Sequence, residues 1–247
     1  MEIRQYLDST YLKKPKQAGL TKAENLEVVK GFIQEAIDEK FKLIMIRQNM
    51  VALAKEMILA QQSKVTVGTV IDFPEGNGSV VDKLSEAKKA IRDGADDLDF
   101  VIDYEAFKSG ELDLVKQQVL ECTKLGLLHH KIVKWIIEVA ALNDHQIVQL
   151  TALIKNVVVA NFKEDCYDSV FVKSSTGFYQ TKDNLPNGAT FPAVKLMLEN
   201  SCPLPVKAAG GVRTYEEAVQ MIQLGVKRIG TSSAKAIVSG QISNNAY

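Results

Sequence analysis

Eight short apolar runs, spaced along the whole sequence, constrain the fold of this chain more than any other feature. They cover residues 3–7, 42–46, 65–71, 98–102, 135–139, 169–174, 205–209 and 228–232. Runs of this length that are rich in β-branched and other apolar residues are typical of buried strands. The sequence therefore predicts eight strands.

The segments between these runs have helical periodicity instead. Apolar residues recur at three- and four-residue spacing, as at positions 26, 29, 33, 36 and 37 and again at 218, 221 and 222. Thr21 with Glu24, and Thr214 with Glu217, have the spacing of a capping box at a helix start. The least regular segment, residues 155–168, is interpreted as an extra turn or short helix before the sixth run.

Strands that alternate with helices pair in parallel through right-handed crossovers, and eight such units close most naturally into a barrel. The 247 residues also match the ~250 residues typical of that fold. We therefore expect the α/β class and a single (β/α)8 TIM-barrel domain over residues 1–247, with a tail from about residue 239 that is free to move. An open doubly wound sheet is the alternative, but no G-x-G-x-x-G follows the first run.

Composition excludes several classes of partner. Thirty basic residues balance thirty acidic ones, so no overall positive field favours nucleic acid or an anionic membrane surface. No apolar run is long enough for a signal peptide or for the ~18 residues of a membrane span. Cys122, Cys166 and Cys202 lie far apart, which is typical of free thiols in a reducing cytoplasm. His129, His130 and His145 have no partner at metal-ligand spacing, so no metal site is predicted.

Polar residues in or at the ends of the apolar runs are the candidates for chemistry, because reacting groups of a β/α barrel project from the carboxyl ends of strands. Asp8 ends the first run and Asp99 lies in the fourth, while three lysines accompany later runs. Lys134 opens the fifth run, Lys173 ends the sixth and Lys207 lies in the seventh. A buried ammonium is costly unless it is paired or loses its proton. For Lys134 alone, a structural salt bridge or a snorkelling position at the edge is the favoured interpretation.

Lys173 and Lys207 stand at similar depth on neighbouring strands, which lie only ~4.8 Å apart. Two ammonium groups ~4 Å apart repel by about 4 kcal/mol at an effective dielectric constant of ~20. We expect this repulsion to lower the pKa of one lysine, so that its neutral amine can attack a carbonyl and form an imine. Asp99 is the candidate for moving protons during this chemistry, a role compatible with its balancing the lysines.

Glycines and serines after the last three runs indicate an anion site. Backbone N–H groups at the corresponding loops of β/α barrels commonly bind phosphate. The candidates are Gly177, Gly210, Gly211, Ser232 and Ser233.

Several motifs together resemble the deoxyribose-phosphate aldolases, a family of class I aldolases. They are LDSTYLK (7–13), GTVIDFPEGN (68–77), GADDLDFVIDY (94–104), KWIIE (134–138), VKSSTGF (172–178), KAAGGVRT (207–214) and RIGTSS (228–233). The resemblance implies reversible cleavage of 2-deoxy-D-ribose 5-phosphate to D-glyceraldehyde 3-phosphate and acetaldehyde, in deoxyribonucleotide catabolism. It implies no metal or organic cofactor, and assembly as a homodimer or homotetramer.

The resemblance also implies residue roles. Lys173 corresponds to the Schiff-base lysine, Lys207 to the lysine that perturbs it and Asp99 to the proton-relay acid. Asp8, Thr10 and Lys134 correspond to a supporting polar network, and the five glycines and serines above to phosphate contacts. Tyr247 is similar to a mobile terminal tyrosine that assists proton transfer in some members.

Two rival functions share parts of this pattern. A barrel isomerase or epimerase has the same phosphate loops but uses acid and base groups rather than a nucleophilic amine. A non-catalytic sugar-phosphate sensor binds without turnover, although crowding like charges in its core brings it no evident benefit.

Overall fold

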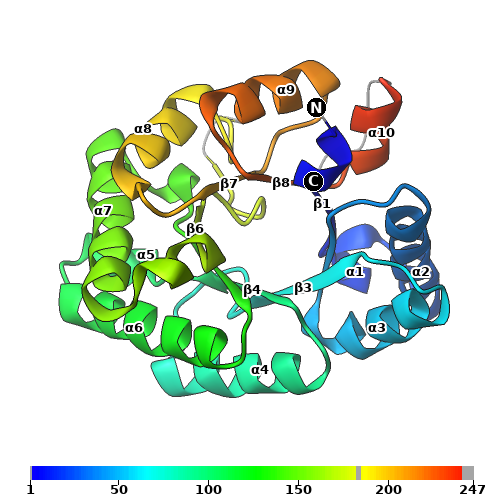
Figure 1. The fold of residues 1–247 in the computed structure, drawn as a ribbon, viewed down its shortest axis with the longest axis horizontal. Helices are drawn as coiled ribbons and strands as arrows, with labels where there is room; N and C mark the ends of the chain where they lie inside the picture. Colours follow the sequence, from blue (N-terminus) through cyan, green and yellow to red (C-terminus); the bar gives the residue numbers. More distant parts are fainter. Residues whose placement is uncertain (1, 182–184, 241–247) are drawn as a thin grey trace.

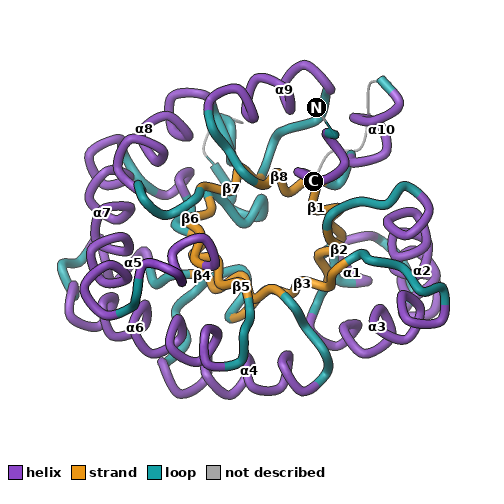
Figure 2. The backbone as a smooth tube through the Cα atoms, in the orientation of Figure 1, coloured by secondary structure: helices purple, strands orange, loops and turns teal. Residues whose placement is uncertain are grey.

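A closed barrel of eight parallel strands forms the centre of the computed structural model, which describes residues 2–181 and 185–240 (Figures 1 and 2). Each strand pairs with the next along the chain, and β1 pairs with β8 to close the ring. The strands are β1 (Leu7–Tyr11), β2 (Leu43–Ile46), β3 (Thr66–Ile71), β4 (Asp97–Val101), β5 (Ile132–Ile136), β6 (Val170–Lys173), β7 (Val206–Ala209) and β8 (Arg228–Thr231). The TIM-barrel prediction is confirmed, and the open doubly wound sheet is excluded.

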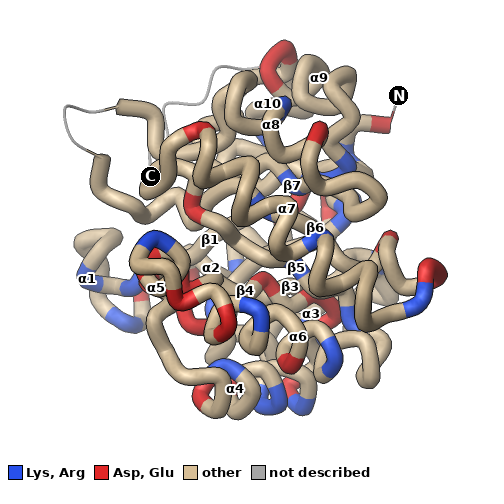
Figure 3. The backbone as a smooth tube through the Cα atoms, turned by 90° about the vertical axis from the view of Figure 1, so that its left-hand side faces the viewer, with Lys and Arg blue, Asp and Glu red and all other residues tan. Residues whose placement is uncertain are grey.

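Helices surround this barrel on its outer face (Figure 2). The α-helices are α1 (Pro15–Ala18), α2 (Lys22–Asp38), α3 (Val51–Ala60), α4 (Val80–Arg92), α5 (Tyr104–Lys108), α6 (Leu112–Leu128), α7 (Asp144–Asn161), α8 (Phe191–Ser201), α9 (Tyr215–Leu224) and α10 (Ala234–Ser239). Short 3-10 helices are η1 (Ile3–Tyr6), η2 (Gln48–Met50), η3 (Val139–Ala141) and η4 (Glu164–Ser169). Acidic and basic residues are interspersed over the outer helices (Figure 3). None of the helices in the described ranges could cross a membrane.

Two predicted strands are displaced along the sequence. Residues 3–6 form η1, and β1 begins only at Leu7, where its pairing with Ile229 of β8 starts. The fifth strand covers 132–136 rather than 135–139, since Glu138 adopts a left-handed backbone conformation with φ of 55° that ends the extended run. Asp8 therefore lies near the start of its strand rather than at its end, and Lys134 lies in mid-strand.

Helix boundaries follow the predicted capping signals. Thr21 and Glu24 cap each other reciprocally at the start of α2, and Thr214 and Glu217 do so at α9. The irregular segment 155–168 divides in two. Its first part continues α7 to residue 161, and its last part forms the predicted short helix, η4.

The apolar core has two parts. The larger part fills the layer between strands and helices, where the buried Trp135 stacks on Phe100 at 5.2 Å and donates its Nε1–H to Thr123 of α6. The smaller part lies inside the barrel and consists of Leu12, Leu43, Met45 and Val70. This interior cluster comes from β2, β3 and the residue after β1, so only one side of the barrel interior is apolar.

Lys83 of α4 is a buried lysine that the strand pattern did not reveal. Its ammonium donates to the Asp72 carboxylate and to the carbonyl oxygens of Gly76 and Val101, at 2.8 and 2.7 Å for the carbonyls. These contacts tie the loop after β3 to the end of β4. Because all the contacts are acceptors, Lys83 is a structural cation.

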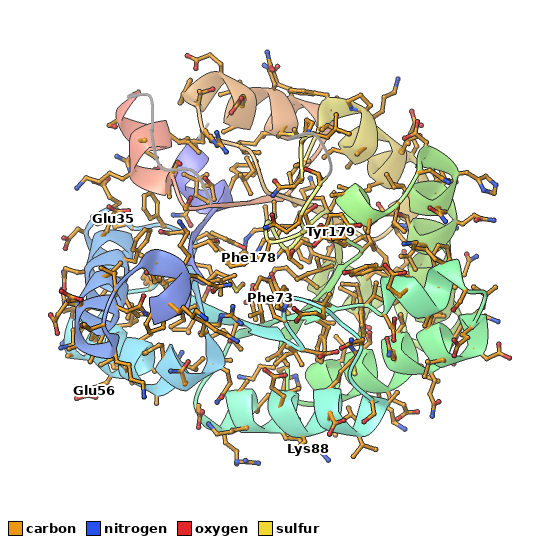
Figure 4. The ribbon with its side chains drawn as sticks, turned by 180° about the vertical axis from the view of Figure 1, so that it is seen from behind. Glu35, Glu56, Phe73, Lys88, Phe178 and Tyr179 are labelled. Carbon is orange, nitrogen blue, oxygen red and sulfur yellow. The ribbon has the colours of Figure 1, made fainter. Side chains whose placement is uncertain are left out.

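Replacing Lys83 by alanine should lower the free energy of unfolding by about 3 kcal/mol, since it leaves buried acceptors without a donor. The exposed Lys88 of the same helix (Figure 4) provides the matched control, and Lys88→Ala should change stability by less than about 0.5 kcal/mol. Urea denaturation followed by circular dichroism measures both. Equal effects of the two substitutions would contradict the structural role of Lys83.

Candidate active site

Charged side chains occupy the side of the barrel interior that the apolar cluster does not fill. They come from β1, β4, β5, β6, β7 and β8, and all are buried. The set comprises Asp8, Asp97, Asp99, Lys134, Lys173, Lys207 and Arg228. Barrel interiors are usually filled by layers of branched apolar residues, so this arrangement needs a chemical explanation.

Lys173 and Lys207 are brought together as predicted. They are register partners on β6 and β7, and each amine lies 2.9 Å from the same oxygen, Asp99 Oδ2. The two amines are thus within two hydrogen-bond lengths of each other. The carboxylate between them is Asp99, which the sequence analysis expected to balance the lysines. It draws the two cations together and compensates part of their repulsion.

The pKa of Lys173 is lowered to about 8. Burial of the amine is the largest cause, Asp99 partly offsets it, and the Lys207 charge lowers the pKa further. The predicted direction is confirmed, but repulsion by Lys207 was wrongly taken as the main cause. A pKa about one unit above neutrality leaves roughly a tenth of the Lys173 amine unprotonated at pH 7.

Asp99 is held as an anion. Burial alone would raise its pKa, but the charges of Lys134, Lys173 and Lys207 outweigh that effect and hold the pKa well below its usual value. Its Oδ1 accepts from Lys134 at 2.8 Å, while Oδ2 accepts from the other two lysines. One carboxylate therefore orients amines from three strands.

Lys134 forms structural salt bridges, which was one of the two interpretations that the sequence allowed. Its amine lies 2.6 Å from Asp97 and 2.8 Å from Asp99. Burial lowers the pKa of Lys134, but the two carboxylates outweigh this effect and raise it above the usual value. Lys134 is thus a protonated support for Asp99 rather than a second nucleophile.

Asp8 and Arg228 extend the charged set toward β1 and β8. Asp8 pairs with Lys207 at 2.6 Å and with Arg228 at 2.6 Å, and Arg228 also reaches Asp97 at 3.4 Å. Thr10, expected in the same network, donates its hydroxyl to the backbone carbonyl of Asp8 at 2.8 Å. Sequence reasoning missed Arg228 and Asp97. Arg228 opens the last apolar run, which was a signal comparable to that of the lysines.

The predicted phosphate residues converge on one pocket of about 340 Å³ at the carboxyl ends of β6, β7 and β8. Gly177, Gly210, Gly211 and Ser232 line it, and the three glycines have φ of 80°, 84° and 88°. Side chains are strained at such angles, so glycine suits these turns. Ser233 does not line the pocket but donates its N–H to Thr231 Oγ1 at 3.0 Å.

Glu138 fixes the loop after β6 and was also missed. Its Oε2 accepts the N–H of Thr176 at 3.1 Å and the Thr176 hydroxyl, and that hydroxyl oxygen accepts the N–H of Phe178 at 3.0 Å. Burial raises the pKa of Glu138, although the hydrogen bonds from Thr176 oppose this. The glutamate lay inside a predicted strand, which concealed its place at the strand end.

An aromatic pair covers the apolar half of the barrel opening. Phe73 and Phe178 contact edge to face, with ring centroids 5.1 Å apart, and both lie near the centre of the barrel (Figure 4). They pack against the interior cluster that contains Met45. The Arg47 guanidinium lies 4.8 Å from the Phe73 ring centroid. The site thus has one apolar wall and one charged wall.

The remaining sequence predictions concern metals, thiols and the tail. Within the described ranges, no group of three His, Cys, Asp or Glu residues is arranged to hold a metal ion. Cys122, Cys166 and Cys202 are free thiols, as predicted. Tyr247 and residues 241–246 lie outside the described part of the chain, so the predictions for the tail stay untested.

Comparisons with known proteins point to one family. The profile described as DeoC/LacD family aldolase matches residues 4–242. The deoxyribose-phosphate aldolase of Thermococcus gammatolerans is 38% identical over 241 residues, covering 97% of this chain and 96% of that protein. Its counterpart from Thermococcus kodakarensis is 37% identical over 240 residues, again covering 97% and 96%.

Solved structures agree with these relatives. The aldolase QR15 superimposes with a TM-score of 0.80 at 30% identity, covering 97% of this chain and 95% of that one. A tetrameric deoxyribose phosphate aldolase from Aeropyrum pernix gives a TM-score of 0.76 at 26% identity, covering 96% and 89%. Because the family profile and relatives above 35% identity span nearly the whole chain, this protein belongs to the DeoC/LacD family of aldolases.

Proposed function

We propose that this protein is a deoxyribose-phosphate aldolase that reversibly cleaves 2-deoxy-D-ribose 5-phosphate through a Schiff base on Lys173. The observation that carries the proposal is the buried Lys173 amine, whose pKa is lowered to about 8, on the strand that leads into a glycine-lined pocket. A partly neutral amine beside an anion cradle suits an aldehyde that bears a phosphate. Full-length relatives that carry this enzyme name support the choice of substrate.

The reaction begins when neutral Lys173 Nζ attacks the C1 carbonyl carbon of the sugar. The carbonyl oxygen takes up a proton, and the carbinolamine then loses water to give a protonated imine. Asp99 Oδ2 contacts the amines of both Lys173 and Lys207, so we assign it to relay protons among these groups. Asp8, Thr10 and Lys134 support this arrangement.

Cleavage follows from the electron demand of the imine. The C3 hydroxyl loses its proton, the C2–C3 bond breaks, and its electron pair forms an enamine on Lys173. D-Glyceraldehyde 3-phosphate leaves. Protonation of the enamine at C2 and hydrolysis of the resulting imine release acetaldehyde and restore the amine. In the synthetic direction the same enamine attacks the aldehyde of glyceraldehyde 3-phosphate.

We assign substrate phosphate to the loops after β6, β7 and β8. Gly177, Gly210 and Gly211 allow the backbone to approach the anion closely, and Ser232 lines the same pocket. Ser233, whose N–H donates to Thr231, is proposed to contribute through its position at the start of α10.

The finer biological setting is also proposed. We infer one catalytic barrel unit that assembles with identical copies, in analogy to the tetramer described for the Aeropyrum pernix protein. The three free thiols support a reducing, cytoplasmic location. The terminal Tyr247 is proposed to assist proton transfer, as its resemblance implies.

Reductive trapping tests the covalent intermediate. Borohydride added with deoxyribose 5-phosphate should give a mass-spectrometric adduct on Lys173, and Lys173→Ala should abolish both adduct and turnover. Lys227→Ala, at an exposed position, is the control and should trap normally. Turnover that borohydride does not affect would instead favour an isomerase, and binding without turnover would favour a sensor.

The pH dependence of kcat/KM tests how Lys173 is activated. In the unmodified enzyme we expect the acidic limb to follow a pKa of about 8, because activity rises as Lys173 loses its proton. Lys207→Leu removes a repelling charge and leaves Asp99 with fewer cations, so both effects raise the pKa of Lys173 and shift that limb to higher pH. An unchanged profile in folded Lys207→Leu protein would refute this electrostatic account.

The role of Glu138 predicts a selective effect on phosphorylated substrate. Glu138→Ala releases the Thr176 contacts that shape the Gly177 turn, so KM for deoxyribose 5-phosphate should rise about tenfold. Glu138→Gln retains a carbonyl acceptor and should restore most of the affinity. Steady-state kinetics with phosphorylated and unphosphorylated deoxyribose measure the effect. The exposed Glu56→Ala (Figure 4) is the control, and an equal KM increase for both sugars would contradict the assignment.

A further inference from the structure

Six of the buried charged side chains form a closed ring of ion pairs in which the sign alternates. Around the ring, the separations between charged atoms are 2.6, 2.9, 2.8, 2.6, 3.4 and 2.6 Å. In order, the ring runs Asp8, Lys207, Asp99, Lys134, Asp97, Arg228 and back to Asp8. Lys173 is attached to this ring from outside, through its contact with Asp99.

The ring is electrically balanced without Lys173. Three carboxylates alternate with three cations, so a protonated Lys173 adds a fourth cation to a buried group of three anions. An uncompensated buried charge is expensive, which favours loss of one proton. Each ring cation contacts two carboxylates, whereas Lys173 contacts one within the described part of the chain. The surplus proton is therefore held most weakly on Lys173.

Arg228 has a specific place in this balance because a guanidinium does not lose its proton in proteins. It supplies a permanent positive charge between Asp8 and Asp97 of the ring. Deprotonation within the cluster must then fall on a lysine. Arg228 and Asp97 make no ion pair or hydrogen bond with Lys173 among the described contacts, so any effect on it acts through the charge of the ring.

We propose that Arg228 and Asp97 are positioning residues that set the charge balance of the ring: the Arg228 cation favours loss of the surplus proton from Lys173, and the Asp97 anion opposes it. This inference rests on the proposed role of Lys173 as the Schiff-base nucleophile. It assigns opposite signs to the two residues, because one supplies a cation to the ring and the other an anion.

The charged groups that face Arg228 and those that face Lys173 both enter this charge balance. Arg228 faces Asp8 on β1, Asp97 and Asp99 on β4, and Lys134 on β5. Lys173 faces a different set of charged groups, which also includes the Glu138 carboxyl. That set comprises Asp99 on β4, Lys134 on β5, Glu138 after β5 and Lys207 on β7.

The direction in which each substitution moves the pKa of Lys173 follows from the numbers of carboxylates and cations that remain. Without the Arg228 charge, three carboxylates face three lysines, so a protonated Lys173 completes the balance and its pKa rises. Without the Asp97 charge, two carboxylates face three ring cations, and the pKa of Lys173 falls. A unit charge removed at roughly 10 Å, with an effective dielectric constant of ~20, changes the proton-dissociation constant about tenfold.

Reductive trapping of acetaldehyde on Lys173, quantified by mass spectrometry across pH, tests the proposal in the full-length protein. Arg228→Gln should move the trapping profile about one pH unit upward, and Asp97→Asn should move it downward by a similar amount. The double variant removes one charge of each sign and should return the profile close to that of the unmodified protein. The exposed pair Glu27 and Lys30, 2.8 Å apart, supplies control variants Glu27→Gln and Lys30→Gln, which should leave the profile unchanged.

The three ring variants keep the proposal open to refutation even if one does not fold. Circular dichroism and thermal unfolding identify the folded variants, and the balanced double variant is expected to be more stable than Arg228→Gln. Folded variants with unchanged profiles, or single variants that shift in the same direction, would overturn the inference. Failure of the unmodified protein to trap acetaldehyde on Lys173 would instead overturn the proposed function, and this inference with it.

Discussion

The buried carboxylate of Asp99 is the interaction on which the interior of this barrel depends. It holds amines from β5, β6 and β7, two of which are 74 and 108 residues away along the chain. Without this anion, three ammonium groups would share a site closed to water, and their repulsion would oppose closure of the barrel. The same contact that allows the strands to close also sets the distance between Lys173 and Lys207. Folding and chemistry are therefore coupled at one side chain.

This arrangement separates stability from reactivity within the fold. Burial of apolar side chains between strands and helices supplies the main stabilisation, and Trp135 and Phe100 belong to that layer. The interior contributes less, because ion pairs removed from water gain little after desolvation. Small residues on neighbouring strands leave space for the charged side chains of the interior. A side chain at Gly230 would approach Lys207 Cε to 3.1 Å, so glycine on β8 leaves space for the lysine on β7.

Much of this site could be predicted from local sequence, and the reason is geometric. A lysine in an apolar run on each of two successive strands is enough to place both amines side by side, because parallel register and strand spacing are nearly invariant. The position of the proposed phosphate loops follows from the same rule, since the carboxyl ends of all eight strands meet at one face. Strand limits were less predictable. Pairing with β8 fixes the start of β1 at Leu7, and the left-handed Glu138 ends the run after β5; neither is visible as a change in hydrophobicity.

One of the missed contacts crosses the barrel. Arg228 pairs with Asp97, 131 residues earlier, only because the closed sheet brings β8 opposite β4. The degree of burial was also not readable from sequence, which is why repulsion was given more weight than desolvation in the activation of Lys173. An apolar neighbourhood in the sequence indicates that a lysine is buried. The same neighbourhood does not indicate how many hydrogen-bond acceptors contact the amine of that lysine.

The number of acceptors distinguishes the four lysines that are buried within residues 2–181 and 185–240. Lys83 has one carboxylate and two carbonyl oxygens, and Lys134 and Lys207 each have two carboxylates. Lys173 shares a single carboxylate with two competing cations. At Lys134 the two carboxylates outweigh burial and raise the pKa, whereas at Lys173 the single shared carboxylate does not, and the pKa falls to about 8. Lys173, the proposed nucleophile, thus combines burial with fewer carboxylate contacts than Lys134 or Lys207 has.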